Sequence, residues 1–109
     1  MRKLVLAAVL AALVAPVAHA QTAEVHVFTP GVVFNSGIQD LAASYTKETG
    51  VKVTVTSKGM AALINDAKTG TPVADIIVAP VSFMDGLEAE GAVVPGTAAD
   101  IGRVYIGVA

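Results

Sequence analysis

Hydrophobic and polar side chains alternate in two short segments of the chain, and a third segment is apolar almost throughout. The alternation at residues 23–29 (AEVHVFT) and 51–56 (VKVTVT) is typical of β-strands. Residues 74–80 (ADIIVAP) are apolar after Asp75, which predicts a strand covered on both faces, as in the middle of a parallel sheet. Residues 103–109 (RVYIGVA) predict the start of a fourth strand.

Helical spacing occupies the segments between these strands, because apolar residues recur there at intervals of three and four. Gly50, Gly70 and Gly91 follow the three predicted helices and are typical of helix ends. Ser82 with Asp85 three residues later resembles a capping box and predicts the start of the third helix. The expected buried stripes are Ile38, Leu41, Ala42 and Tyr45, then Met60, Leu63, Ile64 and Ala67, and then Phe83, Met84 and Leu87.

The predicted order of elements is β-α-β-α-β-α-β, with a helix in every connection between strands. Units of about thirty residues or fewer suit right-handed crossovers between parallel strands. We therefore expect an α/β fold with a doubly wound parallel sheet.

The N-terminus has the pattern of an export signal. A basic start at residues 2–3, an apolar run at 4–14 and the small-x-small sequence AHA before Gln21 are all typical of such signals. The alternative is a transmembrane anchor, but the apolar run is too short to span a bilayer comfortably. We therefore expect residues 1–20 to be cleaved and residues 21–109 to form one small domain in the periplasm.

Composition narrows the classes of partner. The chain has no cysteine, so we expect neither a lipid at the cleavage site nor a disulfide. Removing residues 1–20 takes two of the seven basic residues and leaves five against nine acidic ones, a net charge of −4. That balance disfavours a nucleic-acid partner, since such binding depends on neutralising phosphates with Lys and Arg.

The strand-to-helix loops of a parallel sheet all emerge at one edge, which is where such folds bind ligands. Here those loops are residues 29–35, 57–59 and 79–82. The first belongs to the segment 28–37 (FTPGVVFNSG), which carries no charged side chain. Helices that begin at this edge direct free N–H groups and the positive ends of their dipoles into it. The pattern therefore predicts an anion site built mainly from backbone donors.

Three side chains in these loops are candidates for ligand contact. Lys58 is the basic residue of the group, and it is equally well explained as a solvated turn lysine. Ser57 and Thr29 are either ligand hydroxyls or turn and capping residues, and their place at the binding edge favours the ligand role.

Other chemistries lack a recognisable motif. Gly31 is not part of either nucleotide-binding glycine pattern, and no G-x-S-x-G sequence marks a nucleophile. His26 lies within a predicted strand, and three aspartates on separate elements, Asp40, Asp66 and Asp75, do not suggest a metal cluster. We therefore expect neither an enzyme nor a resident metal or cofactor.

Three sequences in order, ETGVKV (48–53), TGTPVADIIV (69–78) and LEAEGAVVPGT (87–97), carry a resemblance to a known family. Together with the opening VHVFTPG, they resemble the first lobe of bacterial periplasmic solute-binding proteins of the molybdate-receptor type. The resemblance extends from about Ala23 to Ala109. It implies a periplasmic-binding-protein-like fold of type II, whose two lobes close on an oxyanion and deliver it to a membrane ABC permease.

The resemblance also implies that hydroxyls and backbone amides of the loops after the first and second strands hold the anion. Val32, however, stands near the position where molybdate receptors place a serine, and valine donates no hydrogen bond. Either Thr29 substitutes for that serine or the ligand is less polar, for example an organic acid. Carried over to this chain, the expected ligand-binding residues are Thr29, Gly31, Val32, Ser57, Lys58, Gly59 and Met60.

The resemblance implies a second lobe as well, so we expect residues 21–109 to be a truncated first lobe. The alternative to a transport receptor is a standalone α/β interaction domain that dimerises. Its basis is the predicted strand at residues 103–109, since an exposed edge strand invites pairing with another chain.

Overall fold

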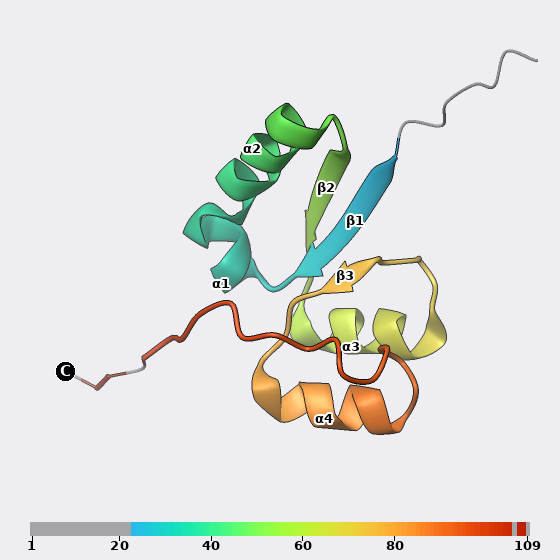
Figure 1. Cartoon of the computed structure of the whole chain (residues 1–109). Coiled ribbons are helices and arrows are strands. Elements are labelled where there is room, and N and C mark those ends of the chain that lie inside the picture. The colour runs from blue at the N-terminus through green and yellow to red at the C-terminus, as the bar shows by residue number, and fades with distance from the viewer. Residues whose placement is uncertain (1–22, 106, 109) are drawn as a thin grey trace, which may run out of the picture.

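The computed structural model describes residues 23–105, 107 and 108. These residues form an α/β fold around a three-stranded parallel sheet, with strands β1 (Glu24–Thr29), β2 (Lys52–Ser57) and β3 (Ile76–Ile77) in the order β2-β1-β3 (Figure 1). The predicted fold class is confirmed. The predicted signal at residues 1–20 lies outside the described residues.

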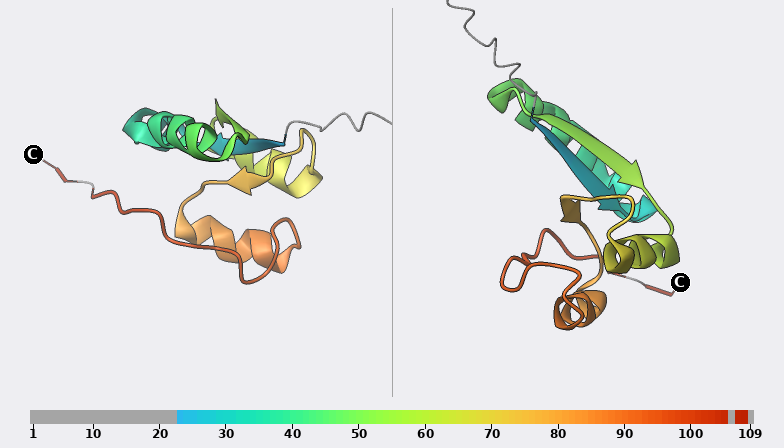
Figure 2. Two further views of the ribbon diagram at one scale, coloured as in Figure 1. Left: turned by 45° about the horizontal axis from the view of Figure 1, so that its top comes forward. Right: turned by 90° about the vertical axis from the view of Figure 1, so that its right-hand side faces the viewer.

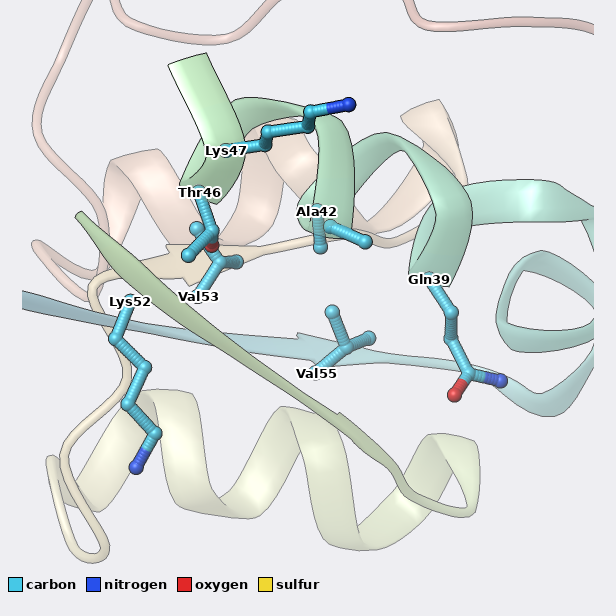
Figure 3. A pocket seen from close by; sticks show the side chains of 8 residues that line it. Gln39, Ala42, Thr46, Lys47, Lys52, Val53 and Val55 are labelled. Atoms are coloured by element: carbon cyan, nitrogen blue, oxygen red, sulfur yellow. The ribbon is translucent and has the colours of Figure 1, made fainter. Parts of the chain in front are cut away.

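Helices fill the connections between the strands. Figure 3 shows α2 on one side of β1 and β2 and α3 on the other, which is the doubly wound arrangement. Helix α4 lies beyond α3, and the segment that follows α4 runs back alongside α4 (Figure 2). The helical elements are α1 (Gly31–Val33), the π-helical segment η1 (Phe34–Ile38), α2 (Gln39–Thr49), α3 (Met60–Thr69) and α4 (Val81–Ala89).

The central strand β1 carries most of the buried residues of the sheet. It pairs with β2 over six registered positions, from Glu24↔Lys52 to Thr29↔Ser57, and with β3 over two. Its last three residues, 27–29, are all buried. Leu63 of α3 and Leu87 of α4 complete the core.

Two helix ends lie where the sequence predicted them. Gly50 follows α2 with a φ of 75°, and Gly70 follows α3 with a φ of 67°. Only glycine adopts this left-handed conformation without a steric penalty. The backbone N–H of each of these two glycines donates to the carbonyl four residues earlier and so closes the last turn of its helix.

The prediction that residues 74–80 form a central, doubly covered strand is wrong. Strand β3 contains only Ile76 and Ile77, lies at an edge of the sheet, and leaves the Ile76 side chain 50% exposed. The central position belongs to β1 because the chain crosses over β1 after leaving β2, and no local apolar pattern encodes the direction of that crossover.

The strand-to-helix loop predicted at residues 29–35 is shorter than expected. The chain is helical from Gly31, directly after an extended Pro30, and continues through a kink at Ser36 and Gly37 into α2. The kink allows the chain to change direction, with Gly37 at a φ of 100°.

The buried face of α2 differs from the predicted stripe. Leu41 is 70% exposed and Tyr45 is also exposed, whereas Ala42 and Thr46 are half-buried. Ala42 and Thr46 lie beside β2, so the helix approaches the sheet through small side chains. The larger apolar residues lie beside this contact and not within it.

The α4 helix does not use the predicted capping box. It begins at Val81 with Pro80 as its N-cap residue, no side chain caps it, and Ser82 lies within the helix. Of its predicted stripe, Leu87 is buried but Phe83 is exposed.

The described residues of the predicted fourth strand are not part of any strand. Residues 103–105, 107 and 108 have no regular secondary structure, and their side chains are exposed. The dimer hypothesis depended on that strand and therefore has no structural support in the described part of the chain.

Candidate functional site

The loops that follow β1 and β2 meet at one edge of the sheet. Thr29 and Ser57 are register partners at the ends of the two strands, and the Lys58 N–H donates to the Thr29 carbonyl at 2.9 Å. A Cβ atom placed on Gly31 would lie 3.8 Å from the Ser57 hydroxyl oxygen, so the first loop passes close to the Ser57 side chain. The structure thus brings together the two loops that the sequence selected.

Each loop leads directly into a helix. The Pro30 carbonyl accepts the N–H groups of Val33 and Phe34 at 3.1 and 3.0 Å, and the Gly59 carbonyl accepts that of Leu63 at 2.9 Å. The N–H groups of the first residues of each helix have no acceptor carbonyl within the helix. Neither helix start has a side-chain cap within the described residues, so these donors remain directed towards the edge.

The Thr29 side chain supports the turn. It is fully buried, and its hydroxyl donates to the Pro30 carbonyl at 3.3 Å. In this structure the Thr29 hydroxyl is therefore engaged within the turn.

The Lys58 side chain is held in an ion pair. Its ammonium Nζ lies 2.6 Å from Asp66 Oδ2 and 4.4 Å from the centre of the Phe28 ring. The side chains of Lys58 and Asp66 are only 20% and 14% exposed. The charge of Lys58 is thus matched by a carboxylate of α3.

The other predicted residues are accessible at the edge. Ser57 is exposed, and its hydroxyl has no hydrogen-bond partner among residues 23–105. Gly59 is exposed, Gly31 and Met60 are half-exposed, and Val32 is 65% exposed. The accessible surface therefore combines one free hydroxyl, backbone donors and two apolar side chains.

Two surface cavities lie away from these loops. One of about 460 Å³ separates α2 from β2, and Figure 3 shows Val53 and Val55 directed from the strand into it, with Lys52 directed to the other side. Sequence reasoning missed this cavity, because the apolar spacing of α2 assigned the large side chains of Leu41 and Tyr45 to the contact together with Ala42, and both are exposed.

The second cavity, of about 620 Å³, lies between β3, α4 and the segment at 92–101. Neither cavity is lined by any of the seven predicted residues.

The described residues contain no other centre with the features of a chemical site. No group of three or more His, Cys, Asp or Glu side chains among them could hold a metal ion. The carboxyl of Glu24 has a lowered pKa, because Thr54 donates a hydrogen bond to it and Lys52 lies beside it. Glu24 begins β1, however, and so lies at the sheet edge opposite the loops. Nor does any helix in the described part of the chain combine the length and apolar character needed to cross a membrane.

In a parallel α/β fold, the edge at which the strand-to-helix loops meet is the place where ligands bind. Residues 25–109 match the bacterial extracellular solute-binding protein family, and the chain belongs to that family. No curated protein and no solved structure matches the chain. Membership implies a solute bound for transport, an ABC permease as partner and typically no catalysis, and it is consistent with secretion.

Proposed function

We propose that this chain binds a small anionic solute at the edge formed by residues 29–32 and 57–60, and presents it to a membrane ABC permease. The observation that carries the proposal is the contact between these two loops, closed by the hydrogen bond from Lys58 N–H to the Thr29 carbonyl. Family membership supports the transport role. The proposed location is the periplasm, reached through a signal at residues 1–20 that is cleaved to leave a first lobe at 21–109.

The proposed contacts are backbone donors and one hydroxyl. Gly31 and Val32 contribute N–H groups from the first loop, and Gly59 and Met60 from the second, beside the Ser57 hydroxyl. Hydrogen bonds to a charged group contribute about 1.5–3 kcal/mol each, and a helix terminus adds roughly 0.3–1 kcal/mol. Four or five such donors outweigh the repulsion from surface acids, which is largely screened beyond about 8 Å at physiological salt.

The solute is a tetrahedral oxyanion such as molybdate, or an organic acid. Ser57 supplies the donor for the oxyanion. The exposed Val32 favours the second candidate, because its side chain donates no hydrogen bond and offers apolar contact to the carbon skeleton of a carboxylic acid.

A thermal melt of the purified chain with molybdate or succinate tests the proposal. A ligand at one hundred times its Kd stabilises the folded state by about 2.7 kcal/mol, which raises the Tm of a small domain by roughly 10–20 °C. The matched control is Ser44→Ala, which removes an exposed hydroxyl from α2, whereas Ser57→Ala removes the proposed contact.

We expect one of the two anions to raise the Tm of the wild type and of Ser44→Ala, and to raise that of Ser57→Ala much less. Failure of both anions at millimolar concentration to move the wild-type melt contradicts the anion proposal. An equal rise in Ser57→Ala would place the bound anion elsewhere on the lobe.

A further inference from the structure

The ion pair between Lys58 and Asp66 differs from the other ion pairs of the described residues. Its two side chains are 20% and 14% exposed, whereas Lys52 and Lys68 keep 63% and 45% of their side-chain surface exposed in their own pairs. An ion pair withdrawn from water is screened little by salt, so its geometry is held more firmly than that of a surface pair.

Lys58 is fixed by three contacts that come from three directions. Its backbone N–H donates to the carbonyl of Thr29 at the end of β1, its ammonium bonds Asp66 in α3, and the same ammonium lies over the Phe28 ring. Phe28 belongs to the buried core. Lys58 therefore attaches the loop after β2 both to the central strand and to the helix that follows.

The residues on either side of Lys58 are the proposed ligand contacts. Ser57 precedes it and carries the free hydroxyl, and Gly59 follows it as the N-cap residue of α3. Any movement of Lys58 moves both neighbours, because each is joined to it by one peptide bond. The ion pair closes only eight residues of chain, which leaves the start of α3 little freedom relative to β1.

From this arrangement we infer that Lys58 and Asp66 are positioning residues of the solute site. Their ion pair holds the Ser57 hydroxyl and the first N–H groups of α3 at the edge of the sheet, and Lys58 does not bind the solute itself. The inference rests on the proposed function for the identity of the site, but it concerns an arrangement that exists without ligand.

The competing role, direct binding of the anion by Lys58, makes the opposite prediction for Asp66. If the lysine bound the anion, Asp66→Asn would release it and tighten binding. If the pair positions the loop, Asp66→Asn loosens the loop and weakens binding. The direction in which Asp66→Asn changes the affinity for the anion therefore separates the two roles.

The experiment compares the wild type with Lys58→Met, Asp66→Asn and the apolar double variant Lys58→Met/Asp66→Leu. The control is Lys68→Met, which also removes one lysine charge but takes it from α3, where it breaks the exposed pair with Glu90. Affinity for molybdate and for succinate is measured by calorimetry, and each value is corrected for the folded fraction. Amide hydrogen exchange is followed at Lys58 and Leu63, whose N–H groups bond Thr29 and Gly59.

We expect each single variant to lose about tenfold in affinity, the range expected when coupled neighbours are disrupted. The double variant should recover most of that loss, because two apolar side chains replace a buried ion pair without leaving a lone charge. Amide exchange at positions 58 and 63 should be faster than in the wild type in both single variants, close to the wild-type rate in the double variant, and unchanged in Lys68→Met.

Tighter binding by Asp66→Asn, or no recovery of affinity in the double variant, overturns the inference. Unchanged affinity per folded molecule in both single variants also overturns it, because the pair would then only stabilise the fold. If the wild type binds neither probe, the proposed function fails on its own. The exchange data then decide whether the pair holds the loop, and unchanged exchange in the single variants overturns the inference.

Discussion

The two sides of β1 are built very differently. On one side, β1 pairs with β2 over six registered positions, and the pairing extends to the last residue of each strand. On the other side, β3 contributes only two registered positions, Val27↔Ile76 and Phe28↔Ile77, and the Ile76 side chain is half-exposed. The Asp75 carboxylate extends this short pairing by accepting the His26 N–H at 2.8 Å.

This difference explains why the candidate site lies between the first two loops. The β1–β2 ladder continues to Thr29 and Ser57, so the loops that follow begin side by side and are further joined through Lys58. The pairing of β3 ends near Val78, whose N–H bonds the Phe28 carbonyl, and no contact of this kind ties the loop at 79–82 to Thr29. A site that depends on convergent backbone donors needs the longer ladder.

The largest effect should come from truncating the two buried leucines, Leu63 of α3 and Leu87 of α4. Leu63→Ala and Leu87→Ala each remove a fully packed side chain, at a cost of about 2–5 kcal/mol. We expect Leu63→Ala to unfold the whole lobe, since α3 covers the β1–β2 pair. Leu87→Ala should open residues 71–105 while β1 and β2 stay protected, because weakly paired segments open sub-globally.

Residue-resolved hydrogen exchange in low urea measures both variants. The control is Leu41→Ala in α2, which removes a leucine that is 70% exposed and should change little. Equal loss of protection throughout β1 and β2 in Leu63→Ala and Leu87→Ala would show that the two sides unfold as one unit, against this comparison.

An intermediate effect is expected where Asp75 reinforces the short side. Asp75→Ala leaves the His26 N–H without its acceptor and should cost about 1 kcal/mol, the usual net value of one hydrogen bond. Asp75→Asn keeps an acceptor oxygen and serves as the control. Urea unfolding gives the stability of each variant, and exchange at His26 shows whether the damage is local. A neutral Asp75→Ala would mean that β3 is held by its backbone pairs alone.

The smallest effect should be the pH dependence on the long side. The pKa of Glu24 lies below its ordinary value of 4.5 because Thr54 and Lys52 hydrogen-bond the charged form. A lowered folded-state pKa stabilises the fold above the unfolded-state pKa, and that stabilisation is lost as the pH falls through the folded-state value. Melts of the wild type and Glu24→Gln across acidic pH should therefore converge as the pH falls. Parallel curves at every pH would show that Glu24 contributes nothing to the ladder.

Local signals predicted most of the elements correctly. Gly50 and Gly70 end their helices as predicted, because a left-handed glycine stops a helix whatever surrounds it. The helical spacing of α3 correctly placed Leu63 in the core. The spacing of α2 was right for Ala42 but wrong for Leu41 and Tyr45, which are exposed, and it missed Thr46. Hydrophobic spacing does not register side-chain size, whereas the side of α2 that lies beside β2 carries the small residues Ala42 and Thr46.

The candidate site shows the same division between local and tertiary information. The prediction that its two loops lie side by side is confirmed. Parallel strands connected through helices bring the loops that follow them to one edge of the sheet. The roles of two of them were not foreseeable. Thr29 is buried by its position at the end of the central strand, and Lys58 is neutralised by Asp66, which lies eight residues further along the chain on another element.

By itself, the sequence determined the α/β alternation, the ends of α2 and α3 and the edge at which the loops meet, since each follows from spacing and turn chemistry within a few residues. The tertiary structure alone decided that β1 is central, that β3 is a short edge strand and that Lys58 is occupied by Asp66. Those outcomes depend on the direction of the crossover from β2 and on contacts between different elements, neither of which the local hydrophobic pattern encodes.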